Sequence, residues 1–348
     1  MIKQLEIENF RCFGKSTLSG FERVNLIGGQ NNSGKTAFLE ALYLNCSPRA
    51  ETVMKLRGIS KETVLTFPER AWNGLFLNHD NQLMVNIKST TQQGMKRESK
   101  ISFGYLEDSE EELSELDENE LENLSSNLFI SCKPSQNDKT SRISAKTGRY
   151  KIIEHNRNFQ QISFISATEK ASSRYLAEQY DKSYLQGHDG KVKEAFHIID
   201  PSITEIRTLM SGEPTIYLSR KNQRPMPIAL FGDAMNRVAH FALELINNQA
   251  GILLIDEIEN GIHHSHQKQL WQWLFALAVE LDVQIFATTH SLEMLTAFKE
   301  AAMGTQYESE VAYFEFVRHV KTGEIIGIKH KVDELDYALS HDGEIRGE

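Results

Sequence analysis

Eight residues near the start of the chain have the types and spacing of a phosphate-binding loop. Residues 29–36, GQNNSGKT, fit the pattern G-x-x-x-x-G-K-T. Glycines let the backbone turn tightly, so that successive N–H groups point at phosphate oxygens. Lys35 supplies a cation for the β- and γ-phosphates, and Thr36 supplies a hydroxyl ligand for Mg²⁺. The pattern predicts a nucleoside triphosphate site. The residues expected to contact the nucleotide are Asn31, Asn32, Ser33, Gly34, Lys35, Thr36 and Ala37.

Two acidic residues follow an apolar segment in the second half of the chain. Residues 252–255, ILLI, predict a buried strand, and Asp256 and Glu257 come directly after it. Ligands bind at the carboxyl edge of a parallel sheet. We therefore expect Asp256 to hold Mg²⁺ and Glu257 to orient and deprotonate the attacking water. The pair alone also fits a helix start, where the helix dipole favours acidic side chains.

A histidine follows a second apolar segment in the same way. Residues 283–288, VQIFAT, predict another buried strand, and Thr289, His290 and Ser291 follow it. We expect His290 to hydrogen-bond the γ-phosphate or the attacking water at the same sheet edge. The alternative interpretation is a helix-capping turn, for which Thr and Ser are typical.

The elements that must position these residues alternate between strands and helices. Apolar runs and alternation predict strands at 2–10, 24–27, 161–166, 252–255 and 283–288, further strands within 75–105, and a β-hairpin from 311–317 and 325–328. Helical spacing predicts helices at 36–45, 236–247 and 266–279, and helical stretches between 166 and 199. Buried strands alternating with helices indicate an α/β fold, with a parallel or mixed sheet covered on both faces.

The composition excludes several classes of protein. The 348 residues are 40% apolar and 9% aromatic, which provides a packed core and excludes global disorder. No apolar run approaches the roughly 20 residues of a membrane helix, and the start of the chain lacks the apolar stretch of a signal peptide. Three widely spaced cysteines exclude a disulfide scaffold and fit a reducing compartment. We expect a cytoplasmic protein that does not contact membranes.

The negative charge is concentrated in one segment. The net charge is −10, and residues 107–122 contain ten acidic residues and no Lys or Arg, so the rest of the chain is neutral. A neutral body has no global basic field to attract nucleic acid. Residues 110–124 predict an acidic helix, either a solvated face or a docking or autoinhibitory element. The basic stretch 139–157, with Arg220, Lys221 and Arg224, is a candidate for nucleic-acid contact.

The three motifs, in this order and separation, resemble the ABC-type ATPase heads of the SMC, RecF and OLD (overcoming lysogenisation defect) proteins. Residues 5–13, LEIENFRCF, resemble their first strand. The chain is most similar to stand-alone bacterial AAA-family ATPases of the OLD-like group, over the first 45 residues and most of 225–348. The resemblance implies a P-loop NTPase of ABC-head type that binds ATP and Mg²⁺. Its mixed β-sheet core is flanked by helices, with an inserted α-helical, acidic segment and a C-terminal β-hairpin. The expected segments are 1–90, 91–160, 161–300 and 301–348.

The resemblance implies further site residues. Arg11 is expected near the adenine or the α-phosphate. Residues 230–237, LFGDAMNR, match the signature region, so that Gly232, Asp233 and Asn236 would meet the γ-phosphate held by a second subunit. Ala234 stands where a glycine is usual. Residues 259–263, ENGIH, match the loop that crosses the dimer interface. The glutamine loop of such heads has only weak candidates, Gln160 and Gln161. The cluster 263–266, HHSH, lacks the cysteine or acidic partner that would complete a zinc site.

The resemblance also implies a biological role. We expect an ATP-hydrolysing switch, a homodimer or higher homo-oligomer that sandwiches ATP between heads and controls a separately encoded effector in bacterial anti-phage defence. The residues after His290 contain no Asp-x-Asp metal motif, so we expect no Toprim nuclease in this chain. Two alternatives stay open: a RecF- or SMC-like ATPase for which DNA binding is the main output, and a nucleotide-bound scaffold that hydrolyses ATP slowly.

Overall fold

The computed structural model describes residues 1–56, 59–104, 126–133, 140–155, 159–168 and 170–340. The chain forms two compact units, each assembled from separate stretches of sequence. Unit 1 comprises Met1–Gly20, Ser33–Gln160 and Arg318–Gly327, and unit 2 comprises Phe21–Asn32, Gln161–Val317 and Ile328–Glu348. The chain therefore passes from unit 2 to unit 1 inside the phosphate loop, between Asn32 and Ser33. The four-segment division made from the sequence stays a prediction.

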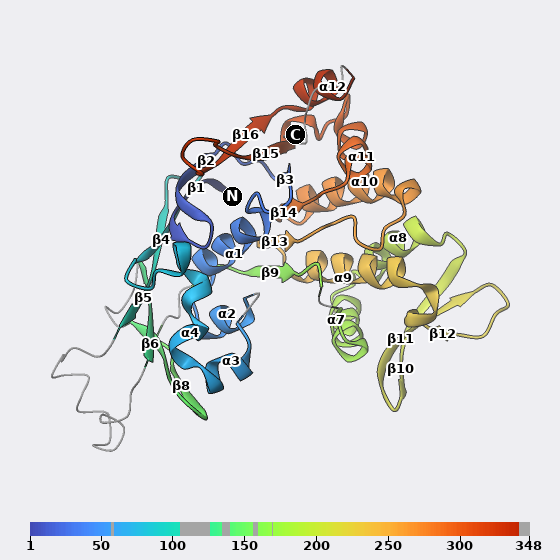
Figure 1. Ribbon diagram of the computed structural model, residues 1–348. Helices are drawn as coiled ribbons and strands as arrows, with labels where there is room; N and C mark the ends of the chain where they lie inside the picture. The colour runs from blue at the N-terminus through green and yellow to red at the C-terminus, as the bar shows by residue number, and fades with distance from the viewer. Residues whose placement is uncertain (57–58, 105–125, 134–139, 156–158, 169, 341–348) are drawn as a thin grey trace. The chain divides into compact units, whose positions relative to one another are not determined.

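The central sheet of unit 2 is built mainly from parallel strands (Figure 1). Its order in the described part of the chain is β16 (Ile325–His330), β15 (Val311–Arg318), β3 (Val24–Gly29), β14 (Gln284–Thr288), β13 (Ile252–Ile255), β9 (Ile162–Ile165), and the boundary between the two units falls within β16, after Gly327. The pairs β15–β3, β3–β14, β14–β13 and β13–β9 are all parallel. The carboxyl ends of β3, β13 and β14 therefore meet at one edge. The predicted strands are confirmed, and β15 and β16, predicted as a hairpin, are neighbours within this sheet.

Helices pack on this sheet and form the main core of unit 2. Their bounds are α7 (Ser173–Leu185), α8 (Asp189–Ile199), α9 (Asp233–Asn247), α10 (His264–Glu280), α11 (Leu292–Ala302) and α12 (Val332–Ser340), with short 3-10 turns η3 (Ile228–Phe231) and η4 (Glu308–Glu310). Leu253 and Ile255 of β13 face this core, and the alternate residues Ile252 and Leu254 are buried as well. Burial on both faces explains why the strand is wholly apolar and confirms the predicted covered sheet.

Unit 2 also holds a small antiparallel sheet that the sequence reading missed. Its strands are β10 (Ile203–Ser211), β11 (Glu213–Arg220) and β12 (Met226–Pro227). Gly212 joins the first two with φ 87°, a conformation that favours glycine in a tight turn. Tyr180 of α7 donates its hydroxyl hydrogen to the Ile206 carbonyl at 3.2 Å. Two alternating runs separated by Ser-Gly were the available signal.

Unit 1 is an antiparallel sheet with the first helix packed against it. In the described residues the strand order is β2 (Phe13–Ser19), β1 (Ile2–Phe10), β4 (Val85–Thr91), β5 (Lys96–Gly104), β6 (Ser126–Lys133), β7 (Ser141–Lys146), β8 (Arg149–Ile153). The helices are α1 (Lys35–Cys46), α2 (Ala50–Lys55), α3 (Lys61–Thr66) and α4 (Pro68–Ala71), with 3-10 turns η1 (Asn73–Leu75) and η2 (Leu77–His79). Asn45 of α1 donates to the Ile87 carbonyl of β4 at 2.9 Å, which ties the helix to the sheet. The strand predicted at 2–10 and the helix at 36–45 are confirmed.

The described residues of the expected insert extend this same sheet. Strands β5 to β8 each pair antiparallel with the preceding strand. Arg142 of the basic stretch is buried, at 6% exposure, and so is not available to a phosphate backbone. The acidic segment 107–122 and the helix predicted at 110–124 lie entirely outside the described residues.

Candidate active site

The first half of the phosphate loop extends from the carboxyl end of β3 in unit 2. A Cβ atom added to Gly28 would lie 2.3 Å from the Tyr313 Oη of the neighbouring strand β15, so only glycine fits there. Gly29 and Asn32 have positive φ angles of 128° and 64°. The chain therefore turns sharply as it leaves the strand, as a loop that wraps around an anion must.

The second half of the loop starts helix α1 in unit 1. Gly34 occupies the N-cap position of the helix with φ 92°. A Cβ atom added to it would lie 2.6 Å from Ile325 Cδ1 and 3.1 Å from Cys12 Sγ. Gly34 has no side chain to cap the helix, and the first turn of α1 has no acidic residue. The helix start can therefore offer backbone N–H groups to an anion. Lys35 is buried, with its Nζ 3.4 Å from Ser33 Oγ.

Asp256 and Thr288 form a buried pair where β13 and β14 end. Thr288 Oγ1 donates to Asp256 Oδ1 at 2.7 Å and accepts from the Glu257 N–H at 2.8 Å. Asp256 and Thr288 are 1% and 0% exposed. One hydroxyl thus fixes the carboxylate expected to hold Mg²⁺ and the backbone of the expected base. The sequence reading did not single out Thr288, although a hydroxyl before Thr289-His290 was visible.

Glu257 and His290 lie close together at this edge. His290 Nε2 is 3.8 Å from Glu257 Oε1, and Asn260 Nδ2 donates to Glu257 Oε2 at 2.8 Å. The His290 N–H donates to Glu259 Oε1 at 2.7 Å, which fixes the histidine backbone. The structure therefore brings Asp256, Glu257 and His290 together, at the edge where β3 ends. Their catalytic roles stay predictions.

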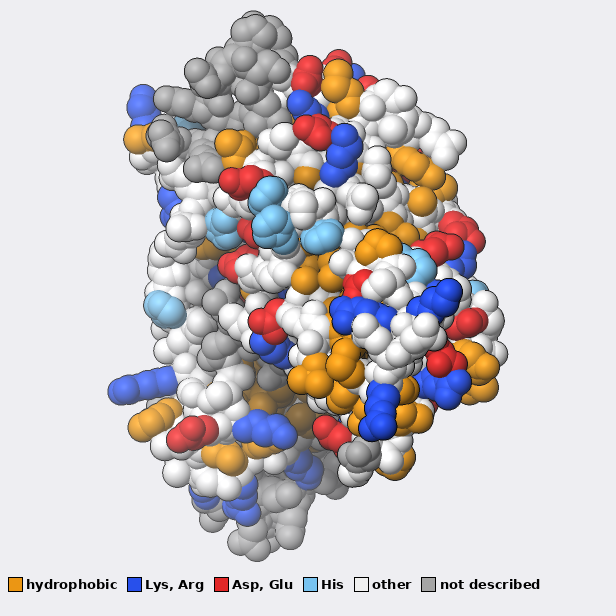
Figure 2. Space-filling view, turned by 90° about the vertical axis from the view of Figure 1, so that its right-hand side faces the viewer, with side chains coloured by type: hydrophobic (Ala, Val, Ile, Leu, Met, Phe, Trp, Pro, Cys, Tyr) orange, Lys and Arg blue, Asp and Glu red, His pale blue; other side chains and the backbone are white. Residues whose placement is uncertain are grey.

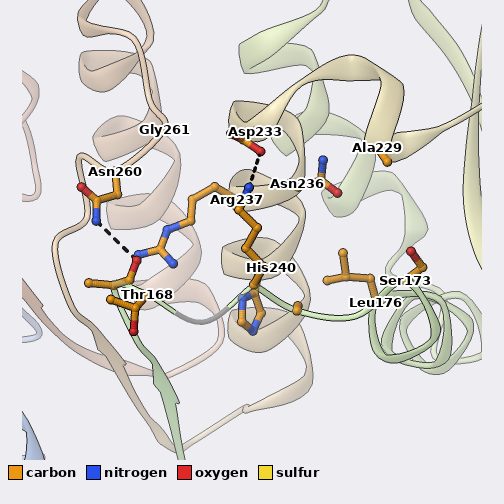
Figure 3. Close-up of a pocket in the computed structure, with 13 residues that line it drawn as sticks. Thr168, Ser173, Leu176, Ala229, Asp233, Asn236, Arg237, His240, Asn260 and Gly261 are labelled. Atoms are coloured by element: carbon orange, nitrogen blue, oxygen red, sulfur yellow. Dashed lines mark hydrogen bonds and ion pairs between the residues drawn. The ribbon is translucent and has the colours of Figure 1, made fainter. Parts of the chain in front are cut away.

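The signature region forms the start of helix α9 (Figure 3). Gly232 precedes the helix with φ 89° and ψ 173°, a conformation open almost only to glycine, and Asn236 Nδ2 donates to its carbonyl at 2.9 Å. Asp233 is exposed and pairs with Lys170 at 2.8 Å. These groups are accessible at a helix N-terminus, as contact with a phosphate would require.

Arg237 lies on the same helix and ends the signature region 230–237, but no role was predicted for its side chain. Its guanidinium donates to the Ser166 carbonyl at 3.0 Å and to the Asp256 carbonyl at 2.9 Å, so it joins α9 to the ends of β9 and β13. Burial lowers the pKa of Arg237, while the carboxylates of Asp256, Glu257 and Glu259 act in the opposite direction. Arg237 also lines a cavity of about 440 Å³ with Asn260 and His240, which Figure 3 shows.

Arg11 lies in unit 1, beside helix α1. Its guanidinium contacts the buried carboxylate of Glu40, with Nε 2.5 Å from Oε2 and Nη2 3.1 Å from Oε1. Arg11 and Cys12 line a cavity of about 530 Å³ together with His79 and Arg318. Cys12 also neighbours Gly34 of the phosphate loop, so this cavity is near the place where the resemblance expects a base or α-phosphate. The sequence reading missed Glu40, because a charged residue on an apolar helix face gives no local sign of its partner.

Several other candidates receive different roles in the structure. Gln161 precedes β9, at the sheet edge opposite to Asp256, which argues against it as the glutamine-loop residue. Arg220 pairs with Asp200 at 2.6 Å and covers the Phe231 ring, so it is occupied within unit 2.

The described residues contain neither a cluster suited to a metal ion nor a helix suited to a membrane. The ring centroids of His263 and His264 lie 4.1 Å apart, with the ring planes tilted by 37°. No group of three or more His, Cys, Asp or Glu side chains in the described ranges is arranged to hold a metal ion. Figure 2 shows exposed histidines gathered on one face. No helix in the described part of the chain is long and apolar enough to cross a bilayer.

The amino-acid sequence of the chain is similar to those of two named proteins. Over 349 aligned residues the chain is 23% identical to a protein named ATP/GTP phosphatase from Helicobacter pylori, covering 90% of this chain and 92% of that protein. Over 43 residues it is 46% identical to the DNA replication and repair protein RecF of Idiomarina loihiensis, covering 12% of each chain.

The fold and the family follow from two further matches. An SMC head solved bound to the C-winged helix domain of ScpA superposes with a TM-score of 0.52 at 12% identity, covering 97% of this chain and 99% of that one. The fold is thus that of an ABC-type ATPase head, as predicted. Residues 24–296 match the family described as "AAA domain, putative AbiEii toxin, Type IV TA system". Because that match spans most of the chain and includes all three motifs, the protein belongs to this AAA-domain family.

Proposed function

We propose that this protein is an ATP-binding and ATP-hydrolysing switch. The observation that carries the proposal is the meeting of Asp256, Glu257 and His290 at the sheet edge from which the loop beginning at Gly29 leaves. The alignment with the Helicobacter pylori protein named ATP/GTP phosphatase supports it, since that alignment spans 90% of this chain. ATP is proposed as the nucleotide, with Mg²⁺ as its metal.

Each residue has a distinct role in this proposal. The N–H groups of the loop and of the start of α1, with Lys35, bind the phosphates. Thr36 and Asp256 hold Mg²⁺, whose charge supplies electrostatic stabilisation of the transferring phosphoryl group. Glu257 accepts a proton from the attacking water, and His290 hydrogen-bonds that water or the γ-phosphate. Arg11, with its position fixed by Glu40, contacts the adenine or the α-phosphate.

We further propose that two copies close on two nucleotides. Gly232, Asp233 and Asn236 of one copy would then contact the γ-phosphate held by the other, for which an exposed helix N-terminus is suited. The SMC head of similar fold was solved bound to part of another protein, ScpA, which supports a separately encoded effector for this chain. We propose anti-phage defence in the bacterial cytoplasm as the setting.

A measurement of molar mass and phosphate release tests the switch. Wild type and Glu257→Gln are compared with and without ATP and Mg²⁺. We expect ATP to double the mass of Glu257→Gln and phosphate release from that variant to be lost, because the closed state forms but cannot hydrolyse. A mass that never responds to ATP would instead favour the slow-hydrolysing scaffold. Wild-type turnover in Glu257→Gln would remove Glu257 as the base.

A DNA-binding role is the second candidate function. Its specific support is the 46% identity with RecF over 43 residues. It predicts that duplex DNA stimulates ATP hydrolysis and that the stimulation falls steeply between 50 and 200 mM salt, roughly the range over which phosphate contacts are lost. Turnover that is indifferent to DNA would leave the protein-effector switch as the better reading.

A further inference from the structure

The two oxygens of the Glu257 carboxylate have different surroundings. Asn260 Nδ2 donates to Oε2 at 2.8 Å, whereas His290 Nε2 lies 3.8 Å from Oε1. The contact with Asn260 is short enough to be a hydrogen bond, whereas the contact with His290 is too long for one. Among the described residues, Asn260 is therefore the group that fixes the direction of this carboxylate, and Oε1 is left on the His290 side.

The surroundings of Asn260 determine which way its amide points. Its Nδ2 also lies 3.4 Å from the Ala167 carbonyl oxygen, so both neighbours of this atom are acceptors. A primary amide carries its two donors on nitrogen and none on oxygen. The nitrogen must therefore face Glu257 and Ala167. Because Ala167 follows β9 and Glu257 follows β13, Asn260 ties the carboxylate to the end of the neighbouring strand.

The backbone of the same turn is held by other groups. Glu257 has φ 49°, a left-handed conformation that is uncommon for residues other than glycine. Its N–H is bound by Thr288 Oγ1 at 2.8 Å, and its carbonyl accepts from the Asn260 N–H at 3.0 Å. Loss of the Asn260 side chain would therefore release the carboxylate without removing these backbone contacts. Side-chain position and fold can thus be separated by experiment.

We propose that Asn260 is a positioning residue for hydrolysis that acts through Glu257. This inference rests on the proposed function, in which Glu257 is the general base. The Asn260 amide holds Oε2 so that Oε1 stays available to the attacking water, and a base displaced by about 1 Å costs on the order of 100-fold in rate. Asn260 itself does not touch the reacting atoms.

Three variants test the role of the amide donor. Asn260→Ala removes the side chain, and Asn260→Asp keeps its size but replaces the donor by an acceptor. We expect both to lower kcat by about 100-fold while the ATP Kd stays within about twofold, because the phosphate-binding residues are unchanged. The matched control is Asn81→Ala, which likewise removes an asparagine side chain that donates a hydrogen bond, here to Asn73 in unit 1. This substitution should leave kcat unchanged. A wild-type kcat in Asn260→Asp would overturn the proposal.

A double-mutant cycle tests whether Asn260 acts through Glu257. Residual single-turnover rates are compared for Glu257→Gln and for Glu257→Gln with Asn260→Ala. Equal rates are expected, because the amide has no base left to position. The proposal would be overturned if Asn260→Ala lowered the rate of Glu257→Gln by the same factor by which it lowers the rate of the wild-type protein. If Glu257→Gln loses turnover but Asn260→Asp does not, only the positioning role fails; if Glu257→Gln turns over like wild type, the proposed base itself is wrong.

Discussion

At the scale of single residues, the site depends on side chains that bind two neighbours at once. Thr288 donates to Asp256 and accepts from the Glu257 N–H, and Arg237 donates to the carbonyls of Ser166 and Asp256. Such groups connect the ends of adjacent strands. Because they are buried or partly buried, loss of one partner leaves the others without a hydrogen bond, which is costly.

Thr288→Val tests this connection. Valine has the shape of threonine but leaves the Glu257 N–H and the Asp256 carboxylate without their shared hydroxyl. We expect the free energy of unfolding to fall by about 1–3 kcal/mol, and phosphate release to fall because both acidic residues lose their fixed positions. Urea unfolding and a phosphate assay measure the two effects. Thr288→Ser keeps the hydroxyl and is the control; equal stability of the Ser and Val variants would contradict the account.

His240 lines the cavity in Figure 3, and we expect it to make the free energy of unfolding depend on pH. Burial lowers its pKa below 6.5, Glu244 acts in the opposite direction, and Arg237 adds to the lowering. Tyr175 packs edge-on against its ring. The unfolded chain therefore binds more protons than the folded one just below pH 6.5, so the stability present above that pH is lost as the pH falls.

The measurement is urea unfolding at several pH values between 7 and 5. Wild type should lose stability towards pH 5, and His240→Gln should show a shallower dependence, because glutamine does not titrate. Parallel curves for the two proteins would show that another group is responsible for the pH dependence.

At the scale of elements, close packing between strands decides where glycine is required. Gly28 ends β3 beside Tyr313 of the parallel strand β15, and an added Cβ would lie 2.3 Å from Oη and 2.9 Å from Cζ. The phosphate loop begins at this point. A displaced strand end would therefore displace the loop as well as weaken the sheet.

Gly28→Ala should lower the free energy of unfolding by about 1–3 kcal/mol, the usual cost of overpacking. It should also weaken ATP binding, which isothermal titration measures. The matched control is Gly190→Ala in helix α8, where an added Cβ meets nothing within 4 Å. That change should stabilise the protein by roughly 0.5–1 kcal/mol, since alanine favours helix. Equal effects of the two substitutions would refute the packing argument.

At the scale of the whole molecule, the proposed closure of two copies makes each site a composite of two chains. Lys35→Ala removes a phosphate contact of one chain, and Asp233→Arg places a much larger side chain at the signature region of the other. Asp233 is 73% exposed as a side chain, so the fold should tolerate the change. Each variant alone should be inactive.

Mixing the two variants should restore part of the activity. A mixed pair has one site with an intact loop from the Asp233→Arg chain and an intact signature from the Lys35→Ala chain. Phosphate release from the mixture is measured against each variant alone, with two preparations of the same variant as the control. No recovery, although mixed pairs form, would show that the sites are not shared between chains.

Residue types and their spacing are enough to predict the motifs and most of the elements that position them. The apolar runs 24–27, 252–255 and 283–288 predicted three buried strands, and the structure has them as β3, β13 and β14. Hydrophobic periodicity is a local property, so it is legible without tertiary structure. Parallel strands share a carboxyl edge, which is why the meeting of Asp256, Glu257 and His290 could be predicted as well.

The polar partners of each site residue could not be predicted in this way and become visible in the folded chain. Arg11 with Glu40, Thr288 with Asp256, and Arg237 with Ser166 join positions far apart in sequence, and no local pattern marks them. The addition of β5 to β8 to the N-terminal sheet, and the separate sheet of β10 to β12, likewise depend on pairing between strands. The physical reason is that hydrogen-bond partners and strand neighbours are selected by packing of the whole chain, whereas burial of a strand is encoded in its own residues.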